Sequence, residues 1–317
     1  MTHGCFFDLG FLYWLEKLRN PVLDAIMQFF TYFGQELLFM VVALAVFWCV
    51  DKRKGYYLLS IGFVGTIINQ FLKLLFRVPR PWVKDPNFTI VESARSGATG
   101  YSFPSGHTQN VVGTFGGIAR STQKRWLRAA AIAVLLLTSF SRMYLGCHTL
   151  ADVGVSFIIA SILVLALYPL FKSMDEHPNR MYGLLAAFLT IALGYLLFLK
   201  IYSFPADLEP EKYRDGLKNA YSLLGALVGL LIVYPVERKY IHFETKAVWW
   251  AQILKVTLGL VGALIIKEGL KALFRPMFGA ALFPNAIRYF FLVLFAGIVW
   301  PLTFPFWSKI GRKERER

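Results

Sequence analysis

Long apolar stretches recur along this chain, and they constrain its fold more than any other feature. Each is close to the roughly 20 residues that an α-helix needs to cross a bilayer. A segment buried in lipid can satisfy its backbone hydrogen bonds only as a helix or as part of a closed barrel. The stretches lie near 29–50, 55–76, 127–146, 150–171, 181–202, 217–235, 247–273 and 287–307.

The composition agrees with a membrane protein. The 317 residues are 56% hydrophobic and only 17% charged, whereas a soluble domain has about 25% charged residues. The formal net charge of +15 is concentrated in short loops between the apolar stretches. This pattern is typical of contact with anionic lipid headgroups, and it argues against binding of nucleic acid. We therefore predict an all-α, polytopic integral membrane bundle.

The first residues and the cysteines add two expectations. Residues 9–19 alternate aromatic and charged side chains, so we expect an interfacial helix within an N-terminal segment 1–28. The N-terminus shows no basic region or cleavage site of a signal peptide. Cys5, Cys49 and Cys147 are too far apart to form a CxxC pair or a disulfide framework.

Charge in the loops predicts the topology. We count a ninth, shorter span at 107–120, which is rich in glycine ("VVGTFGGIA"). With nine spans, the basic clusters at 52–54, 124–128, 238–246 and 308–317 all fall on one side. The positive-inside rule makes that side cytoplasmic, with the chain starting outside and ending inside a cell membrane.

Three segments place ionisable residues on the opposite, extracytoplasmic side. They read "KLLFRVPRPW" (73–82), "YSFPSGHTQN" (101–110) and "SRMYLGCHTLADV" (141–153). Such residues are costly beside a membrane and usually mark a functional site. Fixed cations, a helix N-terminus and two histidines together suit a phosphoryl group.

Each feature also has a simpler interpretation. A single histidine could be an interfacial residue, the cations could be snorkelling span ends, and "PSGH" could be a helix cap. A zinc site using Cys147, His148 and His107 is also conceivable. The convergence of all three segments on one side favours the phosphoryl site, in which Asp152 would orient His148, four residues before it.

The three segments resemble the signature of the type-2 phosphatidic-acid phosphatase superfamily. The matching pattern is Lys73-x6-Arg80-Pro81, then Pro104-Ser105-Gly106-His107, then Ser141-Arg142-x5-His148-x3-Asp152. The resemblance implies a six-helix core with the site at one membrane face. It also implies metal-independent, cofactor-free chemistry, in agreement with the lack of a carboxylate cluster for Mg²⁺.

The resemblance assigns a role to each matching residue. His148 would be the nucleophile, Asp152 would orient it, and His107 would protonate the leaving alkoxide and later activate water. The remaining positions would bind the phosphoryl oxygens: Lys73, Arg80, Ser105, Gly106 and Arg142. Arg77 is outside the signature and could face the headgroups.

The expected domains are a phosphatase core at 29–202 and additional transmembrane helices at 203–317. In the second part, "GLKALFRPMF" (269–278) echoes "FLKLLFRVPRPW" (71–82), so a degenerate duplication is one hypothesis. Lys267, Glu268, Lys271 and Arg275 could line a substrate path or pair with one another.

We expect a membrane phosphatase for a lipid phosphate or diphosphate, of the phosphatidic-acid, sphingoid-phosphate or polyprenyl-diphosphate type. The alternatives are a lipid phosphotransferase with the same site, a phosphatase for a soluble sugar phosphate, and a non-enzymatic lipid transporter. The sequence gives no indication of oligomeric state.

The topology can be tested by labelling. A cysteine placed in the 84–99 loop of a cysteine-free background should react with an impermeant maleimide on intact cells. A cysteine placed in 309–317 should react only after permeabilisation. The reverse result would overturn the predicted orientation.

Overall fold

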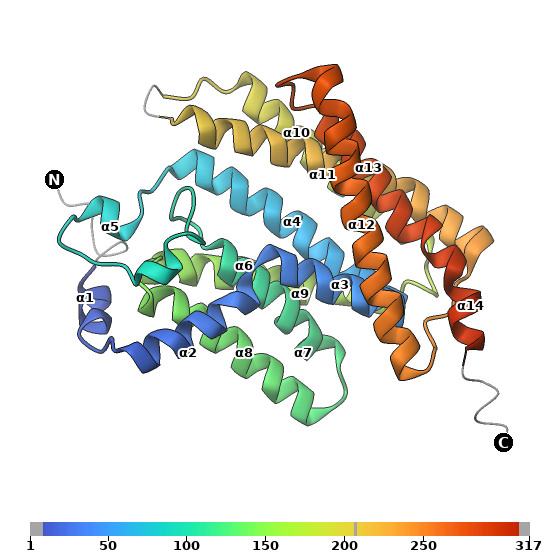
Figure 1. The fold of residues 1–317 in the computed structure, drawn as a ribbon, viewed down its shortest axis with the longest axis horizontal. Coiled ribbons are helices and arrows are strands. Elements are labelled where there is room, and N and C mark those ends of the chain that lie inside the picture. Colours follow the sequence, from blue (N-terminus) through green and yellow to red (C-terminus); the bar gives the residue numbers. More distant parts are fainter. Residues whose placement is uncertain (1–8, 206–207, 311–317) are drawn as a thin grey trace. The chain divides into compact units, whose positions relative to one another are not determined.

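The computed structural model describes residues 9–205 and 208–310, and every regular element within these ranges is a helix (Figure 1). The predicted all-α class is therefore confirmed. Seven helices are long and apolar enough to cross a membrane, or eight if one bent pair counts as a span. This number is roughly consistent with the predicted nine, and the chain is a multi-pass membrane protein.

The first of the seven long spans begins at Lys52, and the last ends at Lys309. They are built from these elements, where η marks a 3-10 or π-helical turn: α4 (Lys52–Phe76), α5 (Pro81–Lys84), α8 (Arg125–Tyr144), α9 (Leu150–Lys172), α10 (Asn179–Ile201), α11 (Pro210–Val236), η5 (Glu237–Ile241), α12 (Trp249–Phe278), α13 (Pro284–Leu294), η6 (Phe295–Val299), η7 (Pro301–Thr303) and α14 (Phe304–Lys309).

The predicted first span, 29–50, is a bent pair of helices rather than one straight helix. It comprises α2 (Pro21–Thr31), the 3-10 turn η2 (Tyr32–Gly34) and α3 (Glu36–Cys49), with a bend of 53°. The pair starts earlier than predicted because Asn20 caps α2: its side chain accepts a hydrogen bond from Leu23 N at 3.0 Å. A short helix, α1 (Gly10–Glu16), forms within the segment that was predicted to be interfacial.

The glycine-rich stretch predicted as a short span is also helical. It consists of α6 (Gly106–Val111), the π-helical turn η4 (Val112–Gly116) and α7 (Gly117–Ser121). Its length is below that of the seven long spans, so its crossing of the membrane stays a prediction. A 3-10 turn, η3 (Glu92–Ala94), lies in the long loop before it.

The described chain divides into two compact units, and the first contains every predicted site residue. This unit comprises residues 9–42 and 57–169. Within it, α2 and α6 pack on α8, and α1 contacts α8 as well (Figure 1). The Tyr57 hydroxyl donates to the Val164 carbonyl at 2.6 Å, which ties α4 to α9. These helices end around one group of loops, which carry the site.

The second unit comprises residues 43–56, 170–205 and 208–310. In this unit α11 packs against α10 and α13, and α12 packs against α13. Lys52 pairs with the buried Glu237 at 2.6 Å. Lys271 pairs with Glu268 at 3.6 Å, so these two side chains do interact with one another. The internal duplication stays a hypothesis.

Candidate functional site

The eight predicted site residues all lie at helix ends or in the adjoining loops of the first unit. They are placed as follows: Lys73 near the end of α4, Arg80 directly before α5, Ser105 as the N-cap of α6, Gly106 and His107 in the first turn of α6, Arg142 in the last turn of α8, His148 between α8 and α9, and Asp152 in the first turn of α9.

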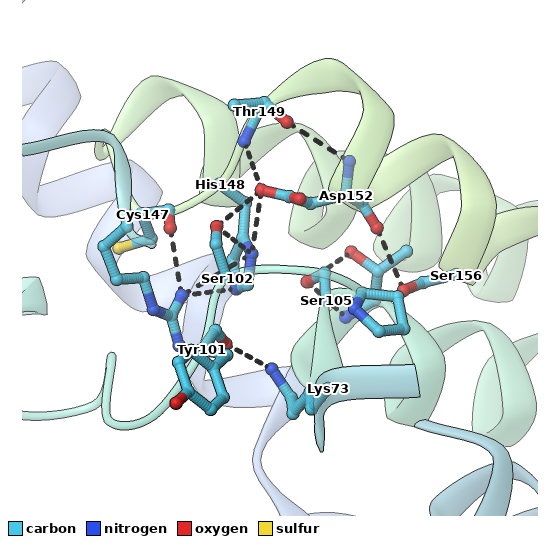
Figure 2. A network of polar contacts seen from close by, with 12 residues as sticks. Lys73, Tyr101, Ser102, Ser105, Cys147, His148, Thr149, Asp152 and Ser156 are labelled. Atoms are coloured by element: carbon cyan, nitrogen blue, oxygen red, sulfur yellow. Dashed lines mark hydrogen bonds and ion pairs between the residues drawn. The ribbon is translucent and has the colours of Figure 1, made fainter. Parts of the chain in front are cut away.

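Hydrogen bonds tie the three signature segments together, as the sequence predicted. Ser102 N donates to the Val78 carbonyl at 2.8 Å, which joins the first segment to the second. Ser105 N donates to the Asp152 carbonyl at 3.0 Å, which joins the second to the third. The Lys73 ammonium donates to the Tyr101 carbonyl (Figure 2).

The loop that carries His148 is fixed at both ends. Gly146 ends α8 with a φ of +82°, a conformation that favours glycine, and its N–H donates to the Met143 carbonyl at 3.0 Å. A β-carbon at position 146 would also lie 3.0 Å from the Thr89 carbonyl oxygen. The N–H of His148 donates to the Arg142 carbonyl at 3.2 Å.

A reciprocal capping box opens α9. Asp152 Oδ2 accepts from Thr149 N at 2.7 Å, and Thr149 Oγ1 accepts from Asp152 N at 3.3 Å. His148 consequently precedes α9 instead of lying in it, although Asp152 remains beside its ring. The capping box therefore places the Asp152 carboxylate next to the His148 ring.

The His148 ring lies between a cation and a carboxylate. Its Nε2 is 2.9 Å from Arg80 Nη1, and its Nδ1 is 3.6 Å from Asp152 Oδ2. A guanidinium can only donate, so Nε2 accepts, and we assign the ring proton to Nδ1 on the carboxylate side. Burial, followed by the charge of Arg80, holds the pKa of His148 well below its usual value. The imidazole is therefore neutral and can act as a nucleophile through Nε2.

Arg80 is held by carbonyl groups. Its Nε donates to Gly100 O at 3.0 Å, its Nη2 to Thr99 O at 2.7 Å and its Nη1 to Cys147 O at 2.9 Å. These acceptors carry no charge, and the Asp152 carboxylate acts on the guanidinium only from the other side of the His148 ring. The side chain is only 7% exposed, so this charge acts where water screens it little.

Arg142 is more deeply buried, at 1% exposure. Its Nη1 donates to the Thr31 hydroxyl, whereas Nε and Nη2 have no hydrogen-bond partner among the residues that the structure describes. A buried charged donor without an acceptor is unfavourable by several kcal/mol, on the order of the penalty for burying an unpaired charge. Such an arrangement is suited to an anionic ligand.

His107 and Ser105 line the second segment. His107 is partly exposed. It interacts electrostatically with the cationic side chains of Arg142, Arg80 and Lys73 and with the His148 ring. Ser105 Oγ caps α6 by accepting from Thr108 N at 3.3 Å. The helix-cap interpretation of "PSGH" therefore holds for Ser105, and its contact with a phosphoryl group, like that of Gly106, stays a prediction.

Sequence reasoning missed Ser102. Its hydroxyl is fully buried and donates to Asp152 Oδ2 at 2.6 Å, and Oγ lies 3.5 Å from His148 Nδ1 (Figure 2). Nothing in the spacing of the "PSGH" motif marks the serine two residues before it, since the contact of Ser102 with Asp152 depends on the approach of another segment. Ser102 and Thr149 together fix the carboxylate that faces the His148 ring.

Within 9–205 and 208–310, no three His, Cys, Asp or Glu side chains form a cluster that could hold a metal ion. The predicted independence from metal is thus a matter for experiment.

Removal of the Ser102 hydroxyl tests its role. Ser102→Ala should lower kcat for phosphate-ester hydrolysis about tenfold with little change in KM, because Asp152 loses a short hydrogen bond. Steady-state kinetics in detergent would measure this. Ser139→Ala is a matched control, because the Ser139 hydroxyl is buried and has no described partner. An unchanged kcat in Ser102→Ala would remove Ser102 from the site.

Two family models match the chain. Residues 53–174 match the family model described as PAP2 superfamily. Residues 221–310 match a second model, described as PAP2 superfamily phosphatase, transmembrane extension. No solved structure matches the chain.

Several curated proteins are similar in sequence. The chain is 25% identical to sphingosine-1-phosphate phosphatase 1 of Rattus norvegicus over 83% of its own length, and spans 63% of that protein. It is 32% identical to undecaprenyl-diphosphatase BcrC of Bacillus subtilis (strain 168), over 46% of this chain and 73% of that protein. Phosphatidylglycerophosphatase B of the same organism is 26% identical, over 51% of this chain and 80% of that protein. Together with the three-part signature and the two family models, these similarities show that the chain belongs to the PAP2 superfamily, the type-2 phosphatidic-acid phosphatases.

Proposed function

We propose that this protein is an integral-membrane phosphatase that hydrolyses a lipid phosphate or diphosphate through a phosphohistidine on His148. The observation that carries the proposal is the buried Arg142, with two donor nitrogens, Nε and Nη2, that lack an acceptor among the described residues. Close to it, a second buried arginine donates to Nε2 of a neutral histidine. An anion that accepts from both arginines would lie at the nucleophile.

The similar proteins support a lipid as the substrate. Their names specify sphingosine-1-phosphate, undecaprenyl diphosphate and phosphatidylglycerophosphate, each of which is a phosphate group on a lipid. The loop charges favour the extracytoplasmic leaflet, because the signature segments lie opposite the basic clusters in the predicted topology. A site at headgroup depth would receive the substrate from the bilayer.

In the proposed first step, phosphoryl oxygens accept hydrogen bonds from Arg142 and Arg80. Arg80 then exchanges its contact with His148 for the phosphate and frees the Nε2 lone pair. Nε2 forms a bond to phosphorus while the bond from phosphorus to the lipid oxygen breaks. His107, protonated while the phosphoryl anion lies beside it and offsets the neighbouring cations, donates a proton to the departing oxygen, and Asp152 stabilises the positive charge that develops on the His148 ring.

In the second step, water attacks the phosphohistidine. His107, now deprotonated, accepts a proton from this water as the oxygen–phosphorus bond forms and the bond to Nε2 breaks. Inorganic phosphate leaves, and both histidines return to their starting protonation states. Once Arg80 has moved its contact from His148 to the phosphate, both arginines keep their bonds to the phosphoryl oxygens through the two steps and stabilise the transition-state charge.

The two histidine roles can be separated by leaving group. In His107→Ala, release of a lipid alkoxide should slow by a factor of about 10²–10⁴, because this oxygen needs a proton to depart. A p-nitrophenolate departs without one, so the burst of p-nitrophenol under single-turnover conditions should be much less impaired. His148→Ala should give no burst with either substrate.

All reactions should be run in EDTA, which also tests independence from metal. Loss of wild-type activity in the chelator, with recovery on adding a divalent ion, would contradict the proposed chemistry. Equal loss of the p-nitrophenol burst in both histidine variants would instead indicate that His107 only shapes the phosphate pocket.

A further inference from the structure

The turn from Phe30 to Gly34, which joins α2 to α3, forms one wall of the candidate site. It lies outside the three signature segments and outside both ranges that match the family models. The Phe30 carbonyl accepts from Thr138 Oγ1 at 3.0 Å, and the Gly34 carbonyl accepts from Asn110 Nδ2 at 3.1 Å. These bonds fix the turn to α8 and α6, the helices that carry Arg142 and His107.

Thr31 contacts the phosphate-binding candidate Arg142 directly. Its hydroxyl accepts a hydrogen bond from Arg142 Nη1, and both side chains are almost fully buried. A guanidinium is planar and rigid, so anchoring one terminal nitrogen restricts the orientation of the other donors. The donors restricted in this way are Nε and Nη2, for which the described residues offer no acceptor.

Gly34 contacts the His107 segment just as closely. A β-carbon at position 34 would lie 2.8 Å from both the Cβ and the carbonyl oxygen of His107. Real side chains essentially never approach so closely, so even alanine would displace the first turn of α6. Because residue 34 is a glycine, the turn can pack directly against the backbone of His107 and so fix its position.

We propose that the Phe30–Gly34 turn is part of the active site, and that Thr31 is a positioning residue that orients Arg142 toward the phosphoryl group. The inference rests on the proposed function for its catalytic readout. The orientation of Arg142 can also be tested by anion binding alone. Thr31 acts through Arg142, and Gly34 acts through His107, so substitutions at the two positions should have different effects.

The test uses the full chain in detergent, with orthovanadate as the probe of the phosphoryl site. Thr31→Val preserves the shape of the side chain and removes the hydroxyl. It should weaken vanadate binding in calorimetry about tenfold and lower kcat/KM similarly, whereas Thr31→Ser should stay within about twofold of wild type. Thr114→Val is the matched control, because among the described residues the buried Thr114 hydroxyl bonds to the Asn110 carbonyl one turn earlier and to nothing in the Phe30–Gly34 turn. Thr31→Ala replaces Thr31→Val if the latter does not remain monodisperse.

Gly34→Ala provides a second test. It should slow release of a lipid alkoxide at least tenfold more than release of p-nitrophenolate, because it displaces the general acid, and it should leave vanadate affinity near wild type. Failure of Thr31→Val to differ from Thr114→Val in vanadate affinity would overturn the role of Thr31. A loss that Thr31→Ser does not rescue would also overturn it.

Failure of the proposed function is a separate outcome. If wild-type protein hydrolyses no lipid phosphate but binds vanadate, and Thr31→Val weakens this binding, the role of Thr31 stands and the phosphatase proposal falls. If wild-type protein does neither, both proposals are rejected.

Discussion

The burial of positive charge at the helix ends of the first unit is the constraint on which the rest of the site depends. Arg80 and Arg142 are nearly inaccessible to water, and their hydrogen bonds go to carbonyl groups, one hydroxyl and the His148 ring, all of them neutral. In a medium of low polarity, uncompensated guanidinium groups are unfavourable, and an anion that pairs with them gains much more than it would in water. The same bonds order the surrounding loops. The arginines are therefore already oriented for the proposed anion before a substrate binds.

The proposed nucleophile, His148, depends on this buried positive charge as much as the bound anion would. Burial, followed by the charge of Arg80, lowers the pKa of His148, and Arg80 contacts Nε2 of the neutral ring while Asp152 faces Nδ1. The carboxylate is held by the capping box at the start of α9 and by Ser102 from another segment. A helix cap normally stabilises only the helix end; this one also positions the carboxylate that we propose acts on His148.

The sequence was sufficient for the membrane class and for the three segments, because apolar length and motif spacing are local properties. It could not predict contacts made by residues with ordinary surroundings in the sequence. Ser102 and Thr31 become important only through tertiary packing, and no spacing rule connects Thr31 to Arg142, 111 positions away. The bend between α2 and α3 was missed for a related reason: a continuous apolar run predicts length, whereas the break follows from the turn at Tyr32–Gly34. The capping box at Thr149 and Asp152 was readable in advance, because its T-x-x-D spacing is a known helix start.

The central claim is that the phosphoryl group passes through His148, and trapping the intermediate tests it most directly. Wild-type protein mixed with a substoichiometric lipid phosphate and quenched in alkali within one turnover should carry phosphate on a single peptide. Mass spectrometry should assign this phosphate to His148, and brief acid treatment should release it, as expected for a phosphorus–nitrogen bond. Product formation without any trapped phosphoenzyme on these timescales, or phosphate on a residue other than His148, would contradict the account.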